Sequence, residues 1–465
     1  MERVCLETYG CQMNFADSEV VGAILTAAGH TLVPTVDEAT FLLINTCAIR
    51  DNAEQRVRHR VRELRALQSR HRDLRVGILG CMAERLQSRL MAEEDNLSLV
   101  CGPDAYRRLP ELIEQVRSGQ QAAETELSTT ETYSDIEPVR LGSNGISAYI
   151  SIMRGCQNYC SYCVVPYTRG RERSRDPQTI VAEARSLFEK GYREVTLLGQ
   201  NVNSYRWNNE EGGMRKEELS ASASNSSFLT PHSSLMVGFP ELISMVADIS
   251  PLLRVRFATS HPKDLSDSLL QAMADHPNIC RCIHLPVQSG SNRMLKAMNR
   301  KYTVEWYLDR VDAIRRYLPD CSITTDVIAG FCGETLEDHQ ATLDLFRRVR
   351  YDYAFMFKYS EREGTYASRH IPDDIPDAEK TRRLNEIIAL QGQIALENNQ
   401  LEVGREYEVL VEGVSHRSDK QLFGRNSQNK VLVFDRGDAQ PGTYRRVRVD
   451  SCTAATLLGT LVPAP

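Results

Sequence analysis

The first hundred residues repeat one pattern, in which a short apolar run ends near a cysteine and a helical segment follows. Strands that alternate with helices predict a mostly parallel, doubly wound sheet with helices on both faces. We expect this α/β domain to span residues 1–117. The three runs occupy residues 4–9, 41–45 and 75–79, and the cysteines that follow them are Cys11, Cys47 and Cys81.

A second series of strand-like runs begins after residues 118–144, a polar stretch that we interpret as a linker. Six runs separated by helical segments predict an incomplete (β/α)6 barrel over residues 145–385, with its site at the C-terminal ends of the strands. Residues 207–237 interrupt the pattern with low-complexity sequence, which predicts a mobile surface insertion. The six runs are 148–153, 194–198, 254–258, 283–287, 322–328 and 354–359.

The last part of the chain changes character again. Residues 377–401 predict a long amphipathic helix. Within 398–465, short β runs separated by Gly, Asn and Asp turns predict a small β-barrel, a fold that often binds RNA. These runs lie at 407–411, around Phe423, and at 431–434 and 444–449.

Composition indicates an ordinary globular protein in a reducing compartment. Of 465 residues, 42% are hydrophobic and 25% are charged, and the thirteen cysteines show no regular disulfide spacing. The N-terminus resembles neither a signal nor a transit segment, and no apolar run has the length of a membrane span. We therefore expect a cytoplasmic protein without membrane contact.

The net charge of −6 means that any nucleic-acid partner must bind to local basic patches. Arginines recur through residues 50–75, where a solvated helix face is the simpler interpretation. A second run alternates just after a group of cysteines and, in an extended segment, would direct most of its charge to one side. Its members, our candidates for RNA contact, are Arg169, Arg171, Arg173 and Arg175.

Cys156, Cys160 and Cys163 follow the first strand of the predicted barrel at spacings of four and three. Three local thiolates can hold three irons of a 4Fe-4S cluster and leave the fourth iron open to a small molecule. The alternatives are an incomplete zinc site or unrelated buried thiols, but no second pair of zinc ligands follows. The trio therefore predicts a reactive iron–sulfur site.

Cys11, Cys47 and Cys81 form a second candidate metal site. The C-terminal ends of parallel strands meet at one edge of the sheet, so these three distant residues are expected to approach one another. The alternative is that strand-end cysteines are small buried hydrophobic residues. Cys5 and Cys101 are interpreted as structural in that sense.

Several motifs together resemble the radical S-adenosylmethionine (SAM) methylthiotransferases, and within them the MiaB-type tRNA-modifying branch, over nearly the whole chain. Gln12-Met13 after Cys11 favours that branch over the one that modifies a ribosomal protein. The chain departs from the family at Cys332 and Glu363, where the family commonly has proline. The matching motifs are residues 8–14, 45–50, 80–81, 156–163, 164–170, 198–203, 259–262 and 284–291.

The resemblance implies a methylthiotransferase domain, a radical SAM core and a C-terminal TRAM domain that binds RNA. It implies two 4Fe-4S clusters, held by Cys156, Cys160 and Cys163 and by the strand-end cysteines, with SAM on the first. The implied reaction converts N6-isopentenyladenosine at position 37 of tRNA to its 2-methylthio derivative. The C2–H bond of adenine is too weakly acidic for acid–base catalysis, whereas a radical can break it. One SAM would methylate a cluster-associated sulfur, and a second would yield the 5′-deoxyadenosyl radical.

Other roles follow from the same resemblance. Polar residues at the end of the second barrel strand are candidates for contact with SAM. Thr259, Ser260 and Gln288, at later strand ends, are candidates for contact with SAM or the adenine, although each of these three is equally suited to a capping or turn role. The implied partners are the anticodon stem-loop of tRNA and an electron donor such as flavodoxin or ferredoxin, and we expect a monomer. The candidate SAM contacts are Gln200, Asn201, Thr259, Ser260 and Gln288.

Two other functions stay open on the sequence alone. A sister enzyme would methylthiolate threonylcarbamoyl-adenosine in tRNA or an aspartate of a ribosomal protein. A protein of another class would be a non-catalytic RNA-binding iron–sulfur electron carrier, which predicts clusters with every iron bound by protein and no turnover of SAM.

Overall fold

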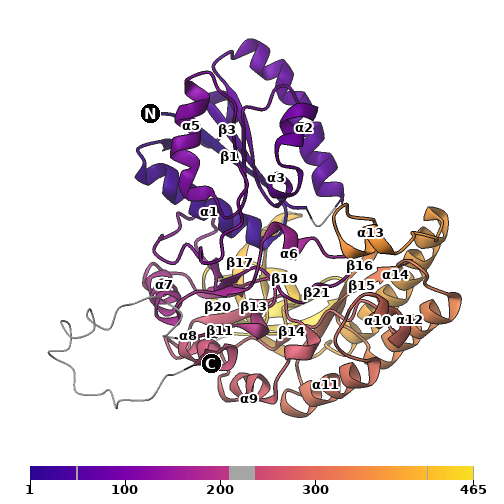
Figure 1. The fold of residues 1–465 in the computed structure, drawn as a ribbon. Coiled ribbons are helices and arrows are strands. Elements are labelled where there is room, and N and C mark those ends of the chain that lie inside the picture. The colour runs from indigo at the N-terminus through magenta and orange to yellow at the C-terminus, as the bar shows by residue number, and fades with distance from the viewer. Residues whose placement is uncertain (49–50, 209–235, 416, 464–465) are drawn as a thin grey trace.

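A computed structural model describes residues 1–48, 51–208, 236–415 and 417–463. The N-terminal part forms one sheet of parallel strands in the order β2-β1-β3-β4-β5-β6 (Figure 1). The doubly wound sheet predicted from the apolar runs is therefore confirmed. The strands are β1 (Arg3–Tyr9), β2 (Thr31–Leu32), β3 (Phe41–Thr46), β4 (Arg75–Gly80), β5 (Leu99–Cys101) and β6 (Ala122–Glu124).

Helices cover both faces of this sheet because successive strand residues point to opposite sides. On β3, Leu43 packs with helices α1 and α5, whereas its neighbours Leu42 and Ile44 pack with α2 and α3. Strand β6 lies within the stretch interpreted as a linker, residues 118–144, and pairs with β5. The helices are α1 (Gln12–Ala27), α2 (Asp51–Arg70), α3 (Cys81–Leu86), α4 (Ser88–Glu93) and α5 (Leu109–Arg117).

The middle of the chain forms two parallel three-stranded sheets, β13-β10-β7 and β14-β15-β16. A bridge between Val255 and Ile279 brings the two together, so the predicted incomplete barrel is confirmed. Its core is built from the apolar residues of these strands and of the surrounding helices. The strands are β7 (Ser147–Ser151), β10 (Glu194–Leu198), β13 (Arg254–Ala258), β14 (Cys282–His284), β15 (Ser322–Ala329) and β16 (Tyr353–Lys358).

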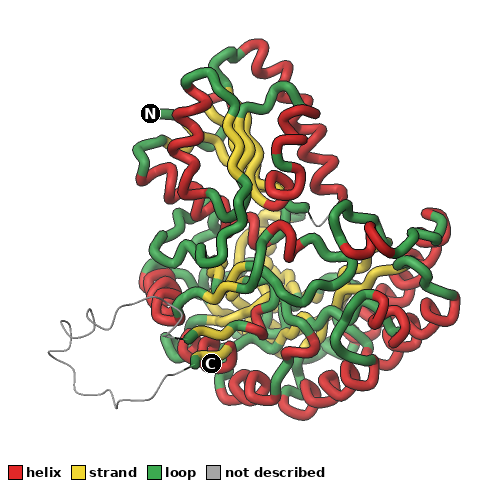
Figure 2. The backbone as a smooth tube through the Cα atoms, viewed as in Figure 1, coloured by secondary structure: helices red, strands yellow, loops and turns green. Residues whose placement is uncertain are grey.

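Helices and short ribbons complete this core, as the tube view in Figure 2 shows. Two short antiparallel pairs, β8 with β9 and β11 with β12, lie outside the barrel sheets. The pair β11–β12 flanks the predicted insertion 207–237, of which residues 209–235 lie outside the described part. The ribbons are β8 (Met153–Arg154), β9 (Arg173–Ser174), β11 (Arg206–Trp207) and β12 (Val237–Gly238). The helices are α6 (Val165–Thr168), α7 (Pro177–Glu189), α8 (Phe239–Ala247), α9 (Asp267–Asp275), α10 (Asn292–Ala297), α11 (Val304–Tyr317), α12 (Leu336–Val349), α13 (Tyr366–His370) and α14 (Asp377–Gln400).

The C-terminal part is a closed barrel of strands in the order β17-β18-β19-β21-β20 around its own apolar core. It docks where the barrel strands begin: Arg254, at the start of β13, donates to the carbonyl oxygens of Arg425 and Glu408. The sequence pattern identified all but the last strand. The strands are β17 (Glu406–Ser415), β18 (Ser418–Arg425), β19 (Val431–Asp435), β20 (Tyr444–Cys452) and β21 (Leu457–Leu461).

In the described ranges, every helix is too short or too polar to cross a lipid bilayer.

Candidate active site

The strand register brings the N-terminal cysteines together. Tyr9 at the end of β1 pairs with Thr46 at the end of β3, and Thr46 pairs with Gly80 at the end of β4. The three strands are neighbours in the sheet, and each is followed within two residues by a cysteine. Cys11, Cys47 and Cys81 therefore share one edge of the sheet, where ligands of doubly wound folds bind.

The surroundings of Cys11 favour its thiolate. Cys11 is the N-cap of α1, and N–H groups at a helix N-terminus stabilise negative charge. A hydrogen bond with Cys47 lowers the pKa of Cys11 to about 6 against the effect of burial, and the charge of Arg169 lowers it further. Burial raises the pKa of the Cys81 thiol, while Arg169 acts in the opposite direction. The site therefore favours the ionised form of one of its thiols, that of Cys11.

Two buried asparagines fix the edge of the sheet beside these cysteines. Nδ2 of Asn14 donates to Oδ1 of Asn45 over 3.1 Å and to the carbonyl oxygen of Thr46 over 3.0 Å. Nδ2 of Asn45 donates back to the carbonyl oxygen of Asn14 over 2.9 Å. Gly80 has φ of +87°, and a Cβ at that position would overlap the Asn45 amide. The start of α1 and the ends of β3 and β4 therefore form one rigid unit.

Arg169 connects this edge to the barrel core. It follows α6, yet its Nε donates to Sγ of Cys81 over 3.1 Å and its Nη2 lies 2.7 Å from Oδ2 of Asp17. Arg154 contacts the other oxygen of Asp17 over 2.8 Å. Burial opposes ionisation of Asp17, but Arg154 and Arg169 outweigh it and hold the pKa of Asp17 below its ordinary value. Charged groups of two domains are thus paired inside the protein.

This pairing corrects the prediction that alternating arginines form an RNA-binding face. Arg169, Arg173 and Arg175 are buried, with 2%, 6% and 7% exposed. Arg173 pairs with both oxygens of Asp104, and Arg175 pairs with Glu183. Carboxylates within the protein neutralise the charges of these three arginines. Arg171 is exposed, so RNA contact stays a prediction for that residue alone.

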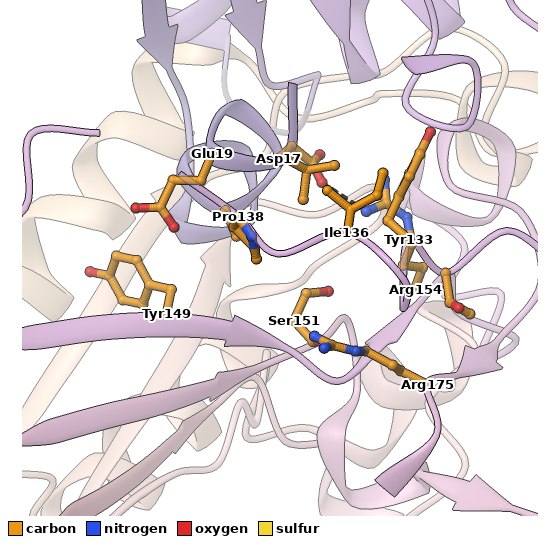
Figure 3. Close-up of a pocket in the computed structure, with 12 residues that line it drawn as sticks. Asp17, Glu19, Tyr133, Ile136, Pro138, Tyr149, Ser151, Arg154 and Arg175 are labelled. Carbon is orange, nitrogen blue, oxygen red and sulfur yellow. Dashed lines mark hydrogen bonds and ion pairs between the residues drawn. The ribbon is translucent and has the colours of Figure 1, made fainter. Parts of the chain in front are cut away.

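A small cavity lies next to the Asp17–Arg154 pair, between α1, the segment that precedes β7, and β7 itself (Figure 3). Figure 3 shows Tyr133 and Arg154 close together beside Asp17, and the Arg154 guanidinium lies 4.9 Å from the centre of the Tyr133 ring. The cavity has a volume of about 20 Å³, which is room for one water molecule. We assign it no substrate.

The second group of cysteines lies in the loop after β8, between β7 and α6. The chain enters this loop at Gly155, whose φ is +80°. The N–H of Cys156 donates to the carbonyl oxygen of Gly170 over 3.1 Å, and the N–H of Ser161 donates to that of Met298 over 3.0 Å. The N–H of Cys163 donates to the carbonyl oxygen of Cys160 over 2.9 Å. The loop is therefore held on both sides by other parts of the barrel.

Arg300 is a site residue that sequence reasoning missed. Its Nη1 donates to Sγ of Cys160 over 3.3 Å. Nδ2 of Asn158 donates to Sγ of Cys156 over 3.5 Å. Burial raises the pKa of Cys156 to about 11 and also raises that of Cys163. Burial alone thus keeps these thiols protonated, and a bound metal must displace their protons.

The predicted SAM contacts stand at the ends of β10, β13 and β14. Oε1 of Gln200, Oδ1 of Asn201 and Oγ of Ser260 are buried and have no hydrogen-bond partner in the part of the chain described. Nδ2 of Asn201 donates a hydrogen bond to Oδ2 of Asp264 over 2.7 Å. Thr259 and Gln288 have φ of +72° and +71°, an uncommon conformation that clusters at functional sites. Unpaired buried polar atoms here fit a polar ligand.

Both cysteine groups fit iron–sulfur clusters by their donor chemistry. Thiolates are the usual ligands of a 4Fe-4S cluster, and each binds a different iron. Across the described ranges, no three His, Cys, Asp or Glu side chains converge as ligands of a single metal ion would. In a 4Fe-4S cluster three thiolates leave one iron without a protein ligand, so the number and kind of donors in each group fit a cubane cluster.

Comparison with known proteins defines the class. Residues 150–346 match the Radical SAM superfamily model, residues 3–102 match Uncharacterized protein family UPF0004, and residues 400–462 match the TRAM domain. The fold is similar to the radical SAM methyltransferase TsrM of Kitasatospora setae, with a TM-score of 0.53 at 14% identity over 77% of this chain and 75% of that one. The matched superfamily model, together with the relatives described next, identifies a radical SAM enzyme.

Relatives of similar length define the family. The chain is 53% identical over 459 residues to the tRNA-2-methylthio-N(6)-dimethylallyladenosine synthase of Phocaeicola vulgatus, which covers 98% of this chain and 95% of the relative. It is 54% identical over 455 residues to the protein of that name from Amoebophilus asiaticus, covering 98% and 91%. The chain belongs to the family of tRNA-2-methylthio-N(6)-dimethylallyladenosine synthases, as the motifs predicted.

Proposed function

We propose that this chain converts N6-isopentenyladenosine beside the anticodon of tRNA to its 2-methylthio derivative. The observation that carries the proposal is the identity of 53% over 98% of the chain with a synthase named for that product. A group of three cysteines lies in each of the two domains that the reaction needs, and this supports the proposal. The chain uses SAM and 4Fe-4S clusters.

The ligands of the clusters are the two cysteine groups. In this proposal Cys156, Cys160 and Cys163 hold the cluster that binds SAM, and the N-terminal edge holds the second through Cys11, Cys47 and Cys81. When bound, the clusters and SAM supply the radical and the methylthio sulfur that substitution at a strong C2–H bond requires. The protein holds the two sites at a fixed separation, which lowers the entropic cost of bringing sulfur and substrate together.

The polar groups at the barrel strand ends bind SAM in this proposal. Gln200, Asn201 and Ser260 contribute buried oxygens that lack partners in the described chain and match the ammonium group and the ribose hydroxyls of SAM. The strained backbone at Thr259 and Gln288 turns the chain after β13 and after β14 and orients the neighbouring side chains.

The C-terminal barrel captures tRNA, with Arg171 as a contact close to the SAM site. We propose the domain limits 145–385 and 398–465 for the barrel core and the C-terminal barrel, while β6 extends the N-terminal domain, expected at 1–117, into the connection 118–144. A flavodoxin or ferredoxin supplies electrons to the clusters. The enzyme acts as a monomer, because one chain contributes both cysteine groups and the tRNA-binding barrel. We propose that it acts in the cytoplasm.

The test is an anaerobic assay of the reconstituted full chain with reductant, SAM and an isopentenylated anticodon stem-loop. We expect 5′-deoxyadenosine and the 2-methylthio nucleoside, both measured by mass spectrometry. The C11A variant should retain 5′-deoxyadenosine formation and lose the methylthio product, whereas C160A should lose both. Methylthiolation of a threonylcarbamoyl stem-loop or a ribosomal protein alone would identify a sister activity. Absence of 5′-deoxyadenosine would indicate an electron carrier.

A further inference from the structure

Arg169 belongs to the barrel core by sequence but lies in the N-terminal domain by contact. It follows directly after α6, six residues beyond Cys163, and its Nε reaches Sγ of Cys81. Only 2% of the residue is exposed. Its Nη1 is buried and has no hydrogen-bond partner among the described residues. A buried guanidinium with an unused donor next to a thiol suits a further acceptor that the described residues do not supply.

Positive charges outnumber negative charges in the group of buried side chains around Arg169. Three buried arginines, Arg154, Arg169 and Arg173, surround two buried carboxylates, Asp17 and Asp104. Within this group one positive charge is left over, and burying a charge without a counter-charge is costly. Sγ of Cys81 is in contact with the arginine that faces the cysteine edge. As a metal ligand Cys81 loses its proton, and its thiolate then supplies the missing negative charge.

Arg169 also ties the two thiolate sites together. Asp17 lies on α1, which begins next to Cys11, while Arg154 precedes Cys156 by two residues. A series of contacts thus runs from one cysteine group to the start of the other, from Cys81 through Arg169 and Asp17 to Arg154. It consists of a hydrogen bond and ion pairs of 2.7–3.1 Å. A fixed link of this kind keeps the two sites at one separation.

We propose that Arg169 is a positioning residue of the N-terminal cluster site, where it donates to the Cys81 thiolate and, with Asp17, sets the charge that the cluster experiences. This inference rests on the proposed ligation by Cys11, Cys47 and Cys81. Hydrogen bonds to sulfur and nearby positive charge stabilise the more negative, reduced form of a cluster. Arg169 accordingly raises the reduction potential of this cluster, and Asp17 limits that effect.

The test uses the full chain with C156A, C160A and C163A, so that the N-terminal site alone can hold a cluster. Into this background we introduce R169Q, D17N and R171Q. R171Q is the matched control, because Arg171 belongs to the same run and is exposed. After anaerobic reconstitution, iron and sulfide are counted and the midpoint potential is measured by a redox titration followed by electron paramagnetic resonance.

The expected shifts have opposite signs. R169Q removes a positive charge and a donor and should lower the midpoint potential, whereas D17N removes a negative charge and should raise it. R171Q should leave it unchanged. Equal potentials in R169Q, D17N and R171Q, or shifts of the same sign in the first two, would overturn the inference, because a purely structural ion pair gives no opposite response.

The iron count separates this inference from the function on which it rests. If the background protein without further substitution binds no cluster, the proposed ligation is wrong and Arg169 loses its role with it. If a cluster is bound and its midpoint potential is unchanged in R169Q and D17N, the inference is overturned while the proposed ligation stands. Should R169Q fail to assemble a cluster, the D17N result decides: a raised potential supports the inference, and an unchanged one contradicts it.

Discussion

Arg300 donates a hydrogen bond from Nη1 to Sγ of Cys160 over 3.3 Å. Its other nitrogens are also bound, Nη2 to the carbonyl oxygen of Pro286 and Nε to the hydroxyl of Tyr302. The guanidinium is therefore fixed before any cluster binds. Arg169 likewise donates a hydrogen bond to Sγ of Cys81. Each cysteine group thus contains one thiol in contact with a buried, immobilised positive charge.

The R300Q variant should cleave SAM more slowly. The substitution removes the charge and the donor at Cys160, and loss of such outer partners typically lowers metal affinity or activity by about 10–100-fold. K301Q is the control, since Lys301 is the next residue and is exposed. The measurement is 5′-deoxyadenosine formed per minute by reconstituted protein. Equal rates for R300Q and K301Q would show that Arg300 does not support the site.

The sequence predicted the fold and both cysteine groups because each depends on local pattern. An apolar run predicts a strand, and parallel strands bring their C-terminal ends together, so Cys11, Cys47 and Cys81 could be grouped without coordinates. Strand β21 was missed because it is short and includes Gly459, which weakens a strand pattern.

Long-range pairing explains the other differences. A run of arginines usually stays in water. Arg169 and Arg173 are buried because Asp17 and Asp104 lie beside them, although these partners stand about 150 and 70 residues earlier in the chain. Arg300 likewise contacts a cysteine 140 residues away. No local signal marks such partners.

The G155A variant should lose the cluster of the barrel core. Gly155 has φ of +80°, which costs other residues about 1–2 kcal/mol, and a Cβ would also overlap the backbone of Arg171 and Gly170. The loop that carries Cys156 would have to move. G191A is the control, because Gly191 has φ of +99° but open space around it. We expect reconstituted G155A to bind fewer irons than G191A, and equal iron contents would contradict this account.

The E84Q variant should change how stability depends on pH. Burial, with Asp104 and Glu124 nearby, raises the pKa of Glu84 to about 8 from 4.5. Between these values the folded protein keeps a proton that the unfolded chain has released, so stability falls as pH rises from 4.5 to 8. Removing this group should stabilise the protein at pH 8 by about 4 kcal/mol and leave it unchanged below pH 4.5.

Thermal unfolding of E84Q and of the parent protein across this pH range checks the sign. E111Q is the control, since Glu111 is exposed on α5. A difference between E84Q and the parent protein that is constant with pH would show that Glu84 is not protonated in the folded state.

The double variant R446Q/R448Q should bind tRNA more weakly. Arg446 and Arg448 alternate on the exposed side of β20 in the C-terminal barrel. If they contact phosphates, their loss should lower affinity and reduce the slope of log affinity against log salt by about 1 per contact. R347Q/R348Q, on the exposed side of α12, is the charge-matched control. Unchanged affinity and slope in R446Q/R448Q would exclude these residues from the tRNA surface.

Anaerobic counting of iron and sulfide tests most directly the claim that three cysteines at each of two sites hold two clusters. The account predicts about eight irons per chain in the parent protein and about four in each triple variant, C11A/C47A/C81A and C156A/C160A/C163A. About four irons in the parent protein, or a triple variant that keeps all eight, would contradict it.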